Sequence, residues 1–115
     1  MDIKERVEGQ HLFLELWEGL ERIGALDHVI VPPEVQIIDV FIEGPFRHQG
    51  CGSRLLTELL RRARAASLTK IFLEVRASNS AALGLYTTFG FVRTGIRKAY
   101  YSKPVEDAVL MERAL

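Results

Sequence analysis

The amino-acid sequence predicts an α+β domain built on a mixed β-sheet flanked by helices. Three features support this prediction: a β-branched run at 35–42, an apolar helical stripe at 52–66 and a second β-rich run at 70–76. Two strands joined through one helix usually pair in parallel with a right-handed crossover, so these segments should form a β-α-β unit. Because 115 residues are enough for one hydrophobic core, we expect a single domain over residues 1–115.

The N-terminal part of the chain predicts two strands, at 11–17 and 22–31, joined by a turn. Leu12, Leu14 and Leu16 alternate as on a strand, although Leu12, Leu16 and Leu20, four residues apart, would also fit a helical face. Gly19 and Gly24 favour the strands, since glycine weakens a long helix. Residues 1–10 are polar, and we expect them to fray. Two consecutive prolines then interrupt the chain before the next strand.

The remainder of the chain predicts the helix of the β-α-β unit, a second helix and two more strands. The apolar face of the helix at 52–66 consists of Leu55, Leu56, Leu59, Leu60 and Ala63. A second helix is expected at 80–89, begun by polar capping side chains and ended by Gly90. A short strand at 91–94 and a closing strand at 107–112 complete the order β-β-β-α-β-α-β-β.

The composition argues against several classes of function. Fifteen basic and fifteen acidic side chains cancel, so the chain gains no general attraction to nucleic acid or to anionic membranes. The sequence contains no run of about 18 apolar residues, so no membrane-spanning helix is expected. The single cysteine, Cys51, cannot form an internal disulfide, and this favours a reducing, cytoplasmic setting. The three histidines are scattered without metal-ligand spacing, so we expect no metal site.

A glycine-bearing loop joins the third strand to the first helix and predicts an anion site. The first N–H groups of a helix lack partners within it, and the helix dipole adds positive potential there. Gly50 and Gly52 have no Cβ atom, so phosphates can approach the main chain. The glycines also fit an ordinary turn, because Leu55 stands where a dinucleotide fingerprint has its third glycine. The residues expected at a pyrophosphate are Arg47, His48, Gln49, Gly50, Cys51, Gly52 and Ser53.

Three further side chains could contribute to chemistry or binding. Glu74 lies in a predicted strand between Leu73 and Val75, and could be a general base or a solvent-facing partner of a basic residue. Tyr86 could protonate a departing thiolate or could be a core aromatic of the second helix. Asn79 could cap that helix or bind a cofactor through its amide. Spacing alone leaves both interpretations open for each residue.

The same segments resemble a known family. The spacing Arg47-x-x-Gly50-x-Gly52 resembles the acetyl-CoA pyrophosphate loop of the GNAT N-acetyltransferases. The runs that resemble the RimI-type ribosomal-protein alanine N-acetyltransferases within that family are 73–82, 85–86, 89–91, 97–101 and 106–111. The resemblance extends over residues 35–115 and implies acetyl-CoA as the co-substrate.

The resemblance also implies positions for the cofactor. Val40, Phe41 and Ile42 would present strand backbone to the acetyl and pantetheine groups. The loop from His48 to Ser53 would hold the pyrophosphate, and Asn79 would hydrogen-bond the cofactor.

The implied catalytic and acceptor residues lie further along the chain. Glu74 would act through water as the general base on an incoming amine, and Tyr86 would be the general acid toward the CoA thiolate. The segment expected to face an acceptor peptide contains Tyr100, Tyr101, Glu106 and Asp107. An equal alternative for these four residues is a packed aromatic pair and a capped turn.

By this resemblance, we expect an enzyme that acetylates a protein N-terminus, the N-terminal alanine of a ribosomal protein. The alternatives are acetylation of another small amine or protein terminus, and a CoA-binding module without catalysis. The family domain usually begins with a strand and two helices ahead of the hairpin expected at 11–31, and the chain should lack them. An uncovered sheet edge and apolar face would then favour a homodimer.

Overall fold

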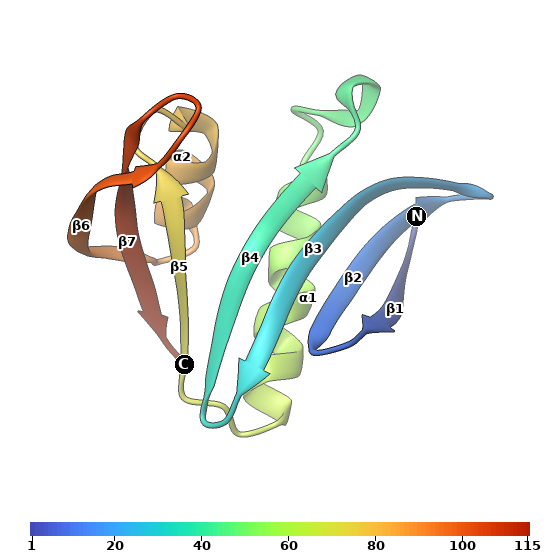
Figure 1. The fold of residues 1–115 in the computed structure, drawn as a ribbon. Helices are drawn as coiled ribbons and strands as arrows, with labels where there is room; N and C mark the ends of the chain where they lie inside the picture. The colour runs from blue at the N-terminus through green and yellow to red at the C-terminus, as the bar shows by residue number, and fades with distance from the viewer.

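The computed structural model describes residues 1–115 as one mixed sheet of seven strands with two α-helices behind it (Figure 1). The strand order is β1-β2-β3-β4-β5-β7-β6, and all neighbours pair antiparallel except β4 and β5. The strands are β1 (Asp2–Glu8), β2 (His11–Glu18), β3 (Glu21–Val31), β4 (Glu34–Ile42), β5 (Lys70–Arg76), β6 (Val92–Tyr101) and β7 (Glu106–Ala114). The helical segments are a 3-10 turn, η1 (Gly44–Phe46), and the helices α1 (Cys51–Ala65) and α2 (Ser80–Thr88). The predicted α+β class, mixed sheet and β-α-β unit are confirmed.

The N-terminal segment differs from the expectation that residues 1–10 fray, which is wrong. Asp2–Glu8 pairs along its whole length with β2 and turns directly into it, so a strand does precede the hairpin while no helix does. The reason lies in contacts across the pair. The ammonium of Lys4 lies 4.7 Å from the Trp17 ring centroid, and the guanidinium of Arg6 lies 4.0 Å from that of Phe13. Such cation–aromatic pairs stabilise a strand that looks polar by itself.

The C-terminal hairpin is longer than the pattern predicted. The strand expected at 91–94 runs from Val92 to Tyr101, and the strand expected at 107–112 runs from Glu106 to Ala114. β6 is an edge strand with almost every side chain exposed, so it carries no apolar alternation that would reveal its length. Neither helix has the length and apolarity that crossing a membrane requires.

The parallel pairing of β4 with β5 stops halfway along the two strands. The ladder runs only from Glu34↔Lys70 to Ile37↔Leu73. At its end β4 contains a bulge, because its register with β3 skips Ile38. A bulge bends its strand and increases its twist. Beyond this point β4 and β5 diverge, as Figure 1 shows, and the edge of β4 that faces β5 has no strand partner.

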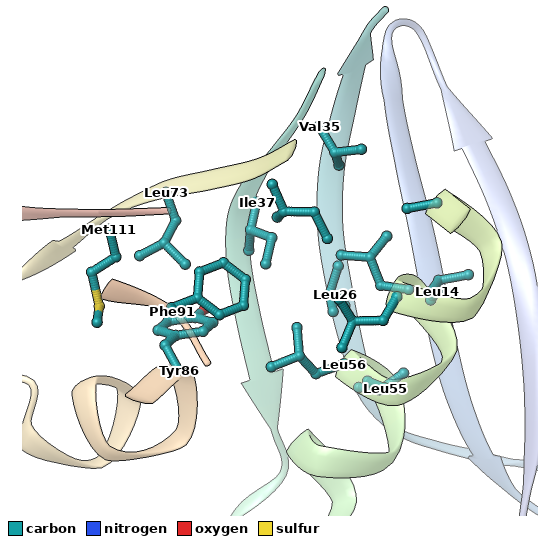
Figure 2. Packing of buried hydrophobic residues seen from close by; sticks show 14 of the residues in the cluster. Leu14, Leu26, Val35, Ile37, Leu55, Leu56, Leu73, Tyr86, Phe91 and Met111 are labelled. Carbon is teal, nitrogen blue, oxygen red and sulfur yellow. The ribbon is translucent and has the colours of Figure 1, made fainter. Parts of the chain in front are cut away.

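The hydrophobic core lies between the sheet and the two helices and continues beneath the diverging strands. One group packs around α1, and its labelled members in Figure 2 are Leu14, Leu26, Leu55 and Leu56. A second group lies under β5 and β7, and its labelled members are Leu73, Tyr86, Phe91 and Met111. Ile37 lies between the two groups. One continuous core therefore supports both walls of the gap, and the predicted apolar face of α1 is confirmed.

His28 is an ionisable side chain within this helix-covered layer. It is only 4% exposed, and its Nδ1 has no hydrogen-bond partner. Burial lowers the pKa of His28 below its usual value; a backbone hydrogen bond at Leu26 and the carboxylates of Asp27 and Glu5 oppose this shift without reversing it. The folded protein therefore favours the neutral imidazole.

Acidification should destabilise the fold through His28. Because its folded-state pKa is lowered, the unfolded chain takes up the proton first, and this contribution to stability is lost as the pH falls from about 6.5 toward the folded-state value. The variant His28→Phe should lose less unfolding free energy than the wild type between about pH 7.5 and about pH 5.5, measured by urea denaturation. The exposed His48→Asn variant should behave as the wild type does. An equal acid loss in wild type and His28→Phe would contradict the assignment.

Candidate functional site

A cleft of about 600 Å³ lies where β4 and β5 diverge, and the start of α1 and the inner side of α2 complete its walls. The predicted cofactor and catalytic residues that line it are Val40, Phe41, Ile42, Arg47, His48, Gly50, Cys51, Gly52, Ser53, Glu74, Asn79 and Tyr86. Gln49 is the exception, because its side-chain amide donates to the carbonyl oxygen of Pro45 at 3.0 Å. The sequence therefore predicted a set of residues that the fold brings together from four separate segments.

The loop before α1 has the geometry of an anion site. The first hydrogen bond of the helix runs from Arg54 N to Gly50 O at 3.0 Å, which leaves the three preceding amides without helical partners. His48 and Gly50 both have left-handed backbone angles, with φ of 61° and 80°. Alternation of left- and right-handed residues is typical of anion-binding backbone nests. The first turn of α1 contains no acidic side chain, so nothing in it offsets the positive end of the helix dipole.

Arg47 joins this loop to the end of β4. Its Nε donates to the carbonyl oxygen of Ile42 at 3.0 Å. This contact fixes the loop relative to the last residue of the strand, while the side chain still lines the cleft. Val40 and Ile42 pack against the core, and Phe41 points to the other face and is 45% exposed. The β5-facing main-chain groups of β4 beyond Ile38 are thus available to a ligand.

Glu74 lies on β5 and points to the sheet face opposite the buried Leu73 and Val75. Its side chain is 18% exposed, and its Oε1 lies 3.3 Å from the Nε of Arg97. Glu74 also lines a second cleft, of about 260 Å³, which Phe72 lines as well. The two clefts share Glu74 and its neighbour Leu73, so they adjoin at this point of β5.

The walls of the second cleft come from β4, β5, β6 and β7. Its other lining residues are Glu34, Lys70, Leu73, Thr94, Arg97, Leu110, Met111 and Glu112. The ammonium of Lys70 lies 3.5 Å from Glu34 and 3.4 Å from Glu112, so charges of both signs line the second cleft. Sequence reasoning missed this cleft, because the long β6 that forms one wall was not predicted.

Tyr86 is part of the core as well as part of the large cleft. It is 5% exposed, and its ring lies 5.4 Å from that of Phe91 between centroids. Burial raises the pKa of Tyr86 above its usual value, and the negative charge of Asp39 raises it further. The phenol therefore keeps its proton near neutral pH and can act as a hydrogen donor.

Asn79 caps α2, because its Oδ1 accepts from the amide of Ala82 at 3.1 Å. The capping interpretation of this residue is confirmed. Its side-chain oxygen is engaged in the cap, and the residue still lines the large cleft. The two interpretations of Asn79 are therefore compatible.

The four residues predicted to face a peptide lie outside the large cleft, around the hairpin of β6 and β7. Tyr100 and Tyr101 pack edge to face with centroids 5.0 Å apart. Hydrogen bonding to Glu74 raises the pKa of Tyr100, which links this residue to the site.

The two acidic members of that set contact groups of their own chain. Glu106 accepts from the amide of Ser78 and pairs with Arg76 at 3.2 Å. Asp107 accepts from the amide of Ala99 at 2.8 Å. The hydrogen bonds from these donors lower the pKa of both carboxylates. Their contacts match the capped-turn alternative.

Comparison with known proteins agrees with this geometry. The profile of the Acetyltransferase (GNAT) family matches residues 2–91. The N-alpha-acetyltransferase RimI of Mycobacterium tuberculosis is 38% identical over 98 residues, covering 84% of this chain and 57% of that protein. The crystal structure of a ribosomal-protein-alanine N-acetyltransferase from Escherichia coli superposes with a TM-score of 0.86 and 28% identity, over 94% of this chain and 71% of that one.

A third relative shows the fold at nearly the same chain length. A GNAT family acetyltransferase from Elizabethkingia anophelis, with acetyl-CoA bound, superposes with a TM-score of 0.87 and 19% identity, over 99% of this chain and 97% of that one. By contrast, the chain spans 57% of the length of the RimI protein that it matches. The match to the family profile covers most of the chain, and the chain belongs to the GNAT acetyltransferase family.

Proposed function

We propose that this chain is an N-acetyltransferase that transfers the acetyl group of acetyl-CoA to a protein N-terminal α-amine, that of an N-terminal alanine in a ribosomal protein. One observation carries the proposal: Glu74 stands where the two clefts meet. A carboxylate in that position can receive a proton from an amine in one cleft that attacks a thioester in the other. The names of the relatives support the choice of acceptor.

The large cleft suits coenzyme A in both shape and chemistry. The partner-free amides at the start of α1 would bind the pyrophosphate, which favours a helix N-terminus. The pantetheine arm carries amides, and these would pair with the free edge of β4 beyond Ile38 as an added strand does. This arrangement would direct the thioester along β4 toward Glu74.

The reaction follows from the groups around the meeting point. A free α-amine has a pKa near 8, so most of it is protonated at neutral pH and cannot attack. Glu74, through water, would take one proton from the ammonium and so free the nitrogen lone pair to attack the acetyl carbon. The second proton would leave the nitrogen to water as the nitrogen–carbon bond forms. Main-chain N–H groups of β4 would stabilise the oxyanion. The carbon–sulfur bond then breaks, and Tyr86 would give its proton to the departing thiolate.

The acceptor would approach from the helix-free face, through the smaller cleft. Glu34 and Glu112 lie along it, and Tyr100 lies beside Glu74. Because Glu106 and Asp107 contact their own chain, we propose that they shape the β6–β7 hairpin instead of binding a basic acceptor residue directly. Acetylation of another amine remains the second candidate, since this cleft carries charges of both signs.

The first test removes the proposed base. Glu74→Gln keeps the size of the side chain but cannot accept a proton, so turnover with acetyl-CoA and a peptide beginning Ala-Arg should fall about 10²–10⁴-fold. Thiol release measures turnover, and calorimetry should show unchanged acetyl-CoA affinity. Glu18→Gln, a remote and exposed strand carboxylate, is the matched control. Wild-type turnover in Glu74→Gln would remove this residue from the mechanism.

A second test addresses the phenol. Tyr86→Phe keeps the ring that packs against Phe91 and removes only the hydroxyl, so stability should change little. If the hydroxyl protonates the thiolate, turnover should fall about 10²-fold or more. Thiol release measures turnover and the midpoint of urea denaturation measures stability, so the two effects of the substitution can be separated. A variant that turns over normally would leave Tyr86 as a core residue only.

The third test concerns the loop. Gly50 has φ of 80°, and this left-handed conformation costs alanine about 1–2 kcal/mol. Gly50→Ala should therefore lose stability and bind acetyl-CoA more weakly. Gly84→Ala is the matched control, because Gly84 lies inside α2 with no atom within 4 Å of its added Cβ. That change should stabilise the fold by about 0.5–1 kcal/mol. Isothermal calorimetry checks the affinity, and equal affinity in Gly50→Ala and wild type would argue against binding at this loop.

A further inference from the structure

We propose that Arg97 is a positioning residue, which holds one oxygen of the Glu74 carboxylate so that the other faces the acceptor amine. The inference rests on the proposed role of Glu74 as the base. Within the chain, Arg97 is the only cationic side chain that makes an ion pair with Glu74, at 3.3 Å between Nε and Oε1.

The register of the sheet explains how Arg97 reaches a residue two strands away. Arg97 on β6 stands opposite Ala108 on β7, which stands opposite Arg76 on β5. Two strand spacings are about 10 Å, a distance that the arginine and glutamate side chains cover together. Ala108, the β7 residue between them in the register, is fully buried. Glu74 is thus approached from across β7 by a side chain that the backbone register fixes.

Tyr100 reinforces this approach from the same strand. Hydrogen bonding to Glu74 raises the pKa of the Tyr100 phenol, and the Arg97 guanidinium lies 5.8 Å from the Tyr100 ring centroid. Both partners therefore come from β6. The opposite side of the carboxylate faces the gap toward β4, where the thioester would lie.

The other cations near Glu74 contact other groups. The titratable groups that face the two clefts or Tyr100 are Glu34 and Asp39 on β4, Lys70 and Arg76 on β5, Arg97, Tyr100 and Tyr101 on β6, Glu112 on β7, Arg47 and His48 in the loop, Cys51 on α1 and Tyr86 on α2. Lys70 is paired with two glutamates, Arg76 is paired with Glu106, and Arg47 donates to the carbonyl oxygen of Ile42. Arg97 is therefore the cation that contacts the Glu74 carboxylate.

The experiment compares Arg97→Gln and Arg97→Lys with the wild type, using acetyl-CoA and the Ala-Arg peptide. Arg97 is more than half exposed, so the effect should be moderate. For Arg97→Gln we expect kcat to fall about two- to fivefold, with KM for acetyl-CoA unchanged. Arg97→Lys should restore only part of kcat, because an ammonium does not fix the carboxylate plane.

The matched control is Arg93→Gln, which removes an arginine from the same strand that makes no ion pair in the structure. It should leave kcat as in the wild type. In the Glu74→Gln background, Arg97→Gln should cause no further loss, since Arg97 acts through Glu74. Wild-type kcat in Arg97→Gln, an equal effect of Arg93→Gln, or a further loss in the double variant would overturn the inference.

A second measurement does not depend on turnover. Three-bond NMR couplings of Glu74 should show a single χ1 rotamer in the wild type and averaging in Arg97→Gln. Averaging in both proteins, or in neither, would overturn the positioning role. If Glu74→Gln turns over as well as the wild type, the proposed function fails instead, and the couplings still report on the pair. The two failures are therefore distinguishable.

Discussion

The early end of the β4–β5 ladder is the constraint on which the site depends. Pairing stops at Ile37 and Leu73, and the bulge at Ile38 turns β4 away. Main-chain groups that would have bonded across the sheet are left facing an open gap, and such groups need partners. The gap persists because one continuous core supports both strands from below, with Tyr86 and Phe91 on one side and α1 on the other. The unpaired edge of β4 is thus available to a ligand without any change of the fold.

The sheet also separates the two sides from which the proposed reactants would approach. The loop before α1 lies at the end of β4 on the helix-bearing side, whereas Glu74 and Arg97 project from the helix-free face. The two faces of the sheet are connected only where β4 and β5 part. Glu74 is the ionisable residue that lines both clefts there. A thioester held along β4 would meet an amine from the opposite face without either having to cross packed side chains. This separation would explain why the proposed acid and the proposed base come from different layers, with Tyr86 in the core and Glu74 in a wall open to solvent.

The parts of this structure that could be predicted from the sequence are those encoded locally. The apolar period of α1, the glycines of the loop and the alternation around Glu74 each depend on neighbours along the chain, and they predicted the helix, the loop before it and the facing of the carboxylate. β1, the full length of β6 and the role of Arg97 depend on partners distant in sequence. Lys4 stabilises β1 only once Trp17 lies opposite, and Arg97 reaches Glu74 only in the observed register. The bulge at Ile38 has no local signature, so the cleft was inferred from resemblance and not from geometry.

The helix-free face shows how a sheet with helices on one side remains compatible with water. Phe13 and Trp17 point to that face, where the cations of Arg6 and Lys4 cover their rings. Between them Glu15 is only 6% exposed and accepts from Arg6 and Arg22, each at 3.0 Å. Burial by itself would raise the pKa of Glu15, but the hydrogen bonds from Arg22, Arg6 and Trp17 lower it overall. The charged side chains thus cover apolar surface on β1–β3 that a helical layer would otherwise cover. This weakens the argument for a homodimer that buries this face. Two of the large apolar side chains that stay exposed, Ile38 and Phe41, lie beside the gap, where an acceptor would pass.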